Sequence, residues 1–147
     1  MDIRVQEAPF DFGKEAAKFA DGHDKVGAIV TFTGIVRDAD AGGLTSMEIE
    51  HYPGMTEAAL TEIAEQAAER WSLADALVIH RFGRLVPGEQ IMMVATASRH
   101  RKDAFEAAEY LMDYLKSRAP FWKKEHANDG SSWVAARDED EDALTRW

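Results

Sequence analysis

The segment from Val26 to Val36, VGAIVTFTGIV, constrains the fold more than any other part of the chain. It is rich in β-branched residues and has apolar side chains at both odd and even positions, which predicts a strand covered on both faces. Such a strand needs a sheet with other elements packed on each side. A length of 147 residues suffices for one such unit, so we expect a single domain, 1–147.

Two amphipathic segments predict long helices that can cover this sheet. The first runs from Thr56, its expected N-cap, to Trp71. Its buried stripe is expected to hold Leu60, Ile63, Ala67 and Trp71. The second runs from Asp103 to Arg118 and stops before Pro120, because the residue that precedes a proline avoids helical angles. Its apolar face is expected to hold Phe105, Ala108, Leu111, Met112 and Leu115.

The remaining apolar segments predict strands joined by tight turns. The expected strands are Thr45–Tyr52, Ala76–Phe82, Gln90–Ala97, Phe121–Ala127 and Ser131–Ala136. Pro87-Gly88 lies between the second and third of these, and Asn128-Asp129-Gly130 between the last two, so both pairs are expected to form antiparallel hairpins. Strands mixed with two long helices favour an α+β fold with an antiparallel sheet.

Composition excludes several classes of function. The net charge of −10 argues against duplex nucleic acid as the main partner, because phosphate binders normally offer a basic face. No apolar run has membrane-spanning length, and the N-terminus lacks the layout of a signal peptide, so a cytoplasmic location is expected. The chain has no Cys, so any sulfur chemistry needs sulfur carried by another molecule.

Basic residues gather between Arg99 and Lys124. This segment has seven basic and four acidic side chains, a net charge of +3 in a chain of −10. One interpretation is a solvated helix face beside a basic strand edge. The other is an anion pocket, in which His100 and Arg101 begin a helix whose free N–H groups attract a phosphate or carboxylate.

Lys116 and Lys123 lie on either side of the helix stop. Lys116 falls in the last helical turn, where a cation is favourable in any case. Strand alternation puts Phe121 and Lys123 on one face, so an aromatic wall and nearby cations should lower the pKa of Lys123. Such an amine can act as acid, base or nucleophile near neutral pH. Lysine is also common as a residue that protects an exposed strand edge, which remains the alternative.

Other positions carry weaker chemical information. Arg37 ends the first buried strand, where it fits either an anion clamp or a surface salt bridge. The histidines lack the spacing of metal ligands, so we expect no metal site and no cofactor. The sequence contains no P-loop, no G-x-S-x-G motif and no dinucleotide-binding glycine pattern.

Four blocks of sequence together resemble a known family. They are VGAIVTFTG with Val36-Arg37, then HYPGM at 51–55, then Ile79-His80-Arg81 with Gly83, and then His100-Arg101 with K-S-R-A-P-F-W-K at 116–123. This combination is similar to the large, catalytic subunit of molybdopterin synthase. The similarity extends from about Val26 to Trp147.

The resemblance implies an α/β hammerhead-type fold with a small extra β subdomain. It implies a homodimer of large subunits inside a heterotetramer with a small ubiquitin-like sulfur carrier. That carrier ends in Gly-Gly with a thiocarboxylate, and its sulfur goes to cyclic pyranopterin monophosphate to form the dithiolene of molybdopterin.

The resemblance also assigns the candidate site. The two essential lysines fall on Lys116 and Lys123, and the anion-binding residues fall on Arg37, His100 and Arg101. Ile35 and Asp38 depart from the lysine and asparagine of some relatives near Arg37. Two other functions stay open: a module that only docks a ubiquitin-like tail or an anionic ligand, and an RNA-binding domain, against which the net charge counts.

Overall fold

The computed structural model of the chain describes residues 1–134 and 138–147 and contains two four-stranded sheets. The first sheet has the order β1-β4-β6-β2. Its strands are β1 (Asp2–Gln6), β4 (Asp75–Arg81), β6 (Gln90–Ser98) and β2 (Ala28–Ile35). β1 pairs with β4 in parallel, and the other pairs are antiparallel.

The second sheet is antiparallel and has the order β5-β3-β7-β8. Its strands are β5 (Gly83–Leu85), β3 (Leu44–His51), β7 (Phe121–Ala127) and β8 (Gly130–Trp133). β5 of this sheet lies between β4 and β6 of the first sheet in sequence. The expected antiparallel pairing of β4 with β6 is confirmed, but the expected hairpin is wrong, because β5 intervenes and pairs with β3 in the second sheet.

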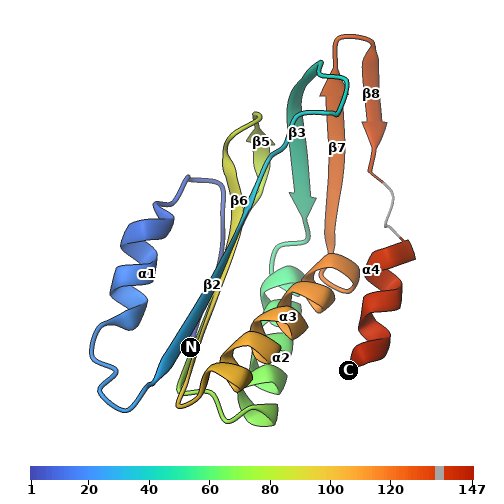
Figure 1. Ribbon diagram of the computed structural model, residues 1–147. Helices are drawn as coiled ribbons and strands as arrows, with labels where there is room; N and C mark the ends of the chain where they lie inside the picture. The colour runs from blue at the N-terminus through green and yellow to red at the C-terminus, as the bar shows by residue number, and fades with distance from the viewer. Residues whose placement is uncertain (135–137) are drawn as a thin grey trace.

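Helices cover both faces of the first sheet (Figure 1). α1 (Phe12–Ala20) packs on one face, and α2 (Met55–Arg70) and α3 (Arg101–Ser117) pack on the other. A short helix, α4 (Asp138–Ala143), and a 3-10 turn (Leu144–Arg146) follow β8. The expected α+β architecture with two long helices is confirmed. The far end of the predicted strand 131–136 lies outside the described residues.

The prediction that Val26–Val36 is covered on both faces is wrong. β2 is an edge strand of the first sheet and pairs only with β6 among the described residues. Ile29, Phe32 and Ile35 are 36%, 44% and 56% exposed. The sequence pattern shows that β2 has apolar side chains on both faces. It does not show whether residues of the same chain cover those side chains.

Two details of the predicted helices also change. α2 begins after Gly54, whose φ of 84° favours glycine, so Gly54 rather than Thr56 is the N-cap. Thr56 lies one position inside the helix and is fully buried. The stripe from Leu60 to Trp71 is buried as expected, whereas Phe105 on α3 is 58% exposed, because α3 turns that side away from the core.

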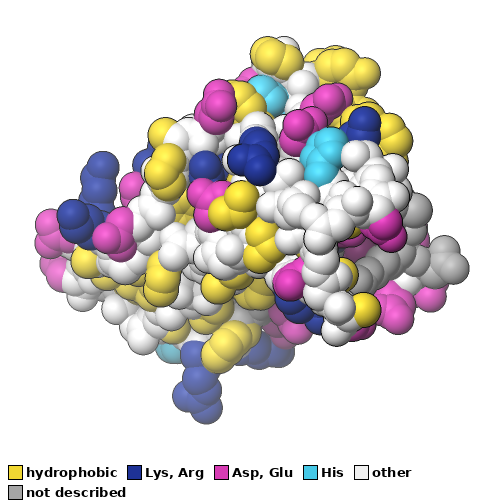
Figure 2. Space-filling view, turned by 90° about the horizontal axis from the view of Figure 1, so that it is seen from above, with side chains coloured by type: hydrophobic (Ala, Val, Ile, Leu, Met, Phe, Trp, Pro, Cys, Tyr) yellow, Lys and Arg dark blue, Asp and Glu magenta, His cyan; other side chains and the backbone are white. Residues whose placement is uncertain are grey.

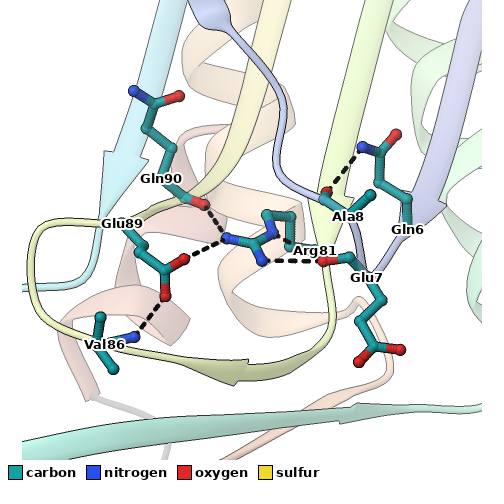
Figure 3. Close-up of polar contacts among 7 residues, drawn as sticks. All are labelled: Gln6, Glu7, Ala8, Arg81, Val86, Glu89 and Gln90. Carbon is teal, nitrogen blue, oxygen red and sulfur yellow. Dashed lines mark hydrogen bonds and ion pairs between the residues drawn. The ribbon is translucent and has the colours of Figure 1, made fainter.

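Arg81 joins three segments at the end of β4 (Figure 3). Its Nε and Nη2 donate to the main-chain oxygen of Glu7 over 3.0 and 2.9 Å. Its Nη1 lies 3.4 Å from Glu89 Oε1 and 3.5 Å from the carbonyl oxygen of Gln90. Glu89 Oε2 in turn accepts from the Val86 N–H. The buried guanidinium thus holds the segment after β1 against the turn before β6.

No helix among the described residues combines the length and the apolar character that a membrane crossing requires.

Candidate active site

A cavity of about 310 Å³ lies where the two sheets and α3 meet. Its polar side chains are those of Lys116, Lys123, His80 and Thr33, and apolar residues form most of the remaining wall. The apolar lining consists of Phe32, Ile35, Ile91, Met92, Met112 and Leu115. Both lysines expected from the sequence therefore line one cavity, together with a histidine that was not expected there.

The chain brings the two lysines together by a sharp change of direction. Lys116 lies in the last turn of α3, and Arg118 caps that helix with its N–H on the carbonyl oxygen of Tyr114. Pro120 then prevents further helix, and β7 begins at Phe121. Because strand side chains alternate, Lys123 points to the same side as Phe121.

The environment of Lys123 changes its acidity. Burial, and next the positive charge of Lys116, lower the pKa of Lys123 from 10.5 to about 8. Asp140 of α4 acts in the opposite direction, but more weakly. An amine with this pKa is present in both protonation states close to neutral pH, which suits proton transfer.

His80 is the functional candidate that the sequence analysis missed. It lies on β4, is 5% exposed, and stacks on Phe121 with the ring centroids 3.7 Å apart. Burial and the charge of Lys123 lower the pKa of His80 from 6.5 to about 3, so its ring is neutral. The sequence points to His80 only through the Ile79-His80-Arg81 block. His80 and Lys123 are far apart along the chain, so the sequence does not show that they line the same cavity.

A single chain does not bring all the expected anion-binding residues together. Arg37 is exposed and comes two residues after Ile35, at the end of β2 that lines the cavity. His100 and Arg101 begin α3, about 22 Å along the helix axis from Lys116. The β2–β6 register agrees, since Ala28 faces Ser98 at one end and Ile35 faces Gln90 at the other. Convergence of Arg37 with His100 therefore needs a second copy of the chain.

The face of the molecule seen from above has no broad area of lysine and arginine side chains (Figure 2). Lysine and arginine side chains alternate there with acidic and hydrophobic ones. This mixed pattern agrees with the net charge of −10. The positive charge that matters for the site is local and belongs to the cavity lysines.

The fold and the cavity define a class of protein: an α+β enzyme-like chain with a lysine pair in a largely apolar cavity and no thiol of its own. Such a site can stabilise developing negative charge and move protons on a bound group. The chain belongs to the MoaE protein family, whose sequence model matches residues 5–118.

Relatives and solved structures agree with this family. The chain is 66% identical over 147 residues to the molybdopterin synthase catalytic subunit of Cereibacter sphaeroides, covering 100% of both chains. It matches the structure of the molybdopterin biosynthesis MoaE protein from Burkholderia ambifaria with a TM-score of 0.85 and 51% identity, covering 99% and 97% of the two chains. Molybdopterin synthase from Staphylococcus aureus matches with a TM-score of 0.81 and 33% identity, covering 89% and 95%.

Proposed function

We propose that this chain is the catalytic subunit of a molybdopterin synthase and acts as a sulfurtransferase. Its substrates are the C-terminal thiocarboxylate of a small ubiquitin-like carrier and cyclic pyranopterin monophosphate, and its product is the dithiolene of molybdopterin. The observation that carries this proposal is the meeting of Lys116 and Lys123 in one cavity. The absence of Cys fits a reaction in which the partner supplies the sulfur.

The two lysines take different roles. Attack of the thiocarboxylate on the pterin creates negatively charged species and requires proton transfers. Lys123, with its pKa lowered to about 8, is suited to give and take the proton. Lys116, at the end of α3, is suited to orient the terminal carbonyl of the carrier and stabilise charge on its oxygen.

The assembly we propose is a homodimer that binds one carrier per chain. Ile29, Phe32 and Ile35 expose apolar surface along the edge of β2 that pairs with no strand in the described part of the chain, and a second chain can cover it. In such a dimer, His100 and Arg101 of one copy would complete the anion pocket that begins with Arg37 and the lysines of the other. This accounts for the wide separation of these residues within one chain.

Turnover tests the proposal directly. The purified chain is mixed with a thiocarboxylated carrier and cyclic pyranopterin monophosphate, and the dithiolene product is measured by mass spectrometry. Product formation that disappears in Lys123→Ala is the expected result. Carrier binding without any product would instead favour the alternative of a module that only docks the carrier tail.

A further inference from the structure

His80 and Lys123 approach the same cavity from different sheets. His80 comes from β4 in the first sheet, and its ring lies flat on Phe121 of β7 in the second, with an angle of 17° between the rings. Lys123 is the next residue on that side of β7, about 7 Å further along the strand. Both side chains line the cavity, and the charge of Lys123 acts on the imidazole.

The hydrogen bond of His80 selects its tautomer. Nδ1 lies 2.8 Å from the main-chain oxygen of Arg81. A carbonyl only accepts, so Nδ1 carries the hydrogen, and in the neutral ring Nε2 has a free lone pair. Among residues 1–134 and 138–147, nothing donates a hydrogen bond to Nε2, and His80 lines the cavity. The ring thus offers one fixed acceptor.

The amine of Lys123 is a hydrogen-bond donor that lacks an acceptor in the described part of the chain. It is also largely buried. The charged groups that act on the pair are Lys116 of α3, His51 of β3 and Asp140 of α4. Of these, Asp140 alone favours the charged amine. A buried ammonium without an acceptor is costly, and one neutral acceptor is available nearby.

We propose that His80 is a positioning residue for Lys123: its Nε2 accepts a hydrogen bond from one water molecule that the Lys123 amine also binds, and this bridge keeps the amine in the cavity. The bridge favours the ammonium over the free amine, because a charged donor gains more from it. The catalytic role of Lys123 rests on the proposed function, whereas the contact itself does not.

A matched pair of variants tests this contact. In His80→Gln the side-chain amide reaches the place of Nε2, and in His80→Asn it reaches only the place of Nδ1. The pKa of Lys123 is measured from the pH dependence of its side-chain NMR resonances in the full chain, assigned with Lys123→Met. We expect the acid dissociation constant of Lys123 to rise about tenfold in His80→Asn and to stay near the wild-type value in His80→Gln. Equal values in both variants and the wild type would overturn the proposal.

A second measurement needs no change at His80. The nitrogen resonances of His80 are compared between the wild type and Lys123→Met. A shift at Nε2 with Nδ1 unchanged is expected, and no shift at Nε2 would overturn the proposal. Turnover with the carrier and the pterin is measured in parallel, with its pH midpoint expected to fall in His80→Asn only. A coupled pair in a chain without turnover would refute the proposed function while leaving this contact in place.

Discussion

The hydroxyl of Thr56 donates a hydrogen bond to the carbonyl oxygen of Pro120 over 3.3 Å. The hydroxyl oxygen of Thr56 in turn accepts a hydrogen bond from the N–H of Tyr52 over 3.0 Å. Thr56 lies in the first turn of α2 and is fully buried, and Pro120 lies between the two cavity lysines. One hydroxyl therefore joins the start of α2 to the corner that sets the distance between Lys116 and Lys123.

Replacing Thr56 by Val should destabilise the protein and disturb the site together. The isosteric change leaves the Tyr52 N–H and the Pro120 carbonyl without this partner, which costs roughly 1–3 kcal/mol. Urea denaturation measures the loss. Thr61→Val is the control, because the Thr61 hydroxyl donates within its own helix, to the carbonyl oxygen of Glu57. Equal stability of the two variants would contradict the role given to Thr56.

Lys116→Ala and Lys123→Ala should each abolish turnover while fold and carrier binding persist. Both amines belong to the one cavity, and neither can replace the other if one moves the proton and the other orients the carbonyl. Lys123→Arg should not restore activity, because a guanidinium does not release its proton near neutral pH. Single-turnover product formation and a carrier-binding titration provide the two readouts.

Lys124 is the matched control for these variants. It points to the other side of β7, where its Nζ lies 5.4 Å from the centre of the Trp133 ring. Lys124→Ala should therefore keep its activity and lose at most about 1 kcal/mol of stability. Loss of turnover equal to that in Lys123→Ala would refute the separate roles of the two faces.

Lys123 should make stability depend on pH in the alkaline range. Its folded pKa of about 8 lies below the ordinary 10.5, so the unfolded chain binds more protons between these values. This contribution makes the free energy of unfolding rise with pH across that window. Lys123→Met should be more stable than the wild type below pH 8, by at most roughly 3 kcal/mol, and the difference should vanish above pH 10.5. Thermal unfolding at a series of pH values checks this.

Mixing two inactive variants should restore activity if two copies share each site. Arg37→Ala and Arg101→Ala remove residues from opposite ends of the β2–β6 pair. A mixed dimer would contain one site with both arginines intact, so exchange of subunits should recover about a quarter of the activity in a statistical mixture. A mixture of Arg37→Ala with Lys123→Ala is the control, because both changes affect the same half-site and should recover nothing.

The parts of the structure that local chemistry decides could be predicted from the sequence. Pro120 had to end α3, and alternation then placed Phe121 and Lys123 on one side of β7. Periodicity likewise located the buried stripe of α2. The lysine pair followed from these local rules together with the family resemblance.

Features that depend on contacts between residues distant in sequence could not be predicted. The apolar pattern of β2 is the same for a central strand and for an edge strand whose surface another chain covers. His80 seemed an ordinary strand histidine, because only the packing of β4 against β7 reveals its stack on Phe121. The start of α2 depends on the positive φ of Gly54, which the sequence does not reveal. Thr56 is a residue type that favours the N-cap, so it was the expected start of the helix.

The hydrogen bonds of Arg81 connect the main chain at Glu7 to the ring of His80. The main-chain oxygen of Arg81 accepts from His80 Nδ1, and the guanidinium of the same residue donates to the main-chain oxygen of Glu7. If β1 were displaced, the ring would be free to exchange tautomers, and Nε2 would become a donor for part of the time. A truncation that removes Glu7 is therefore expected to alter the chemistry of the cavity without changing any residue that lines it.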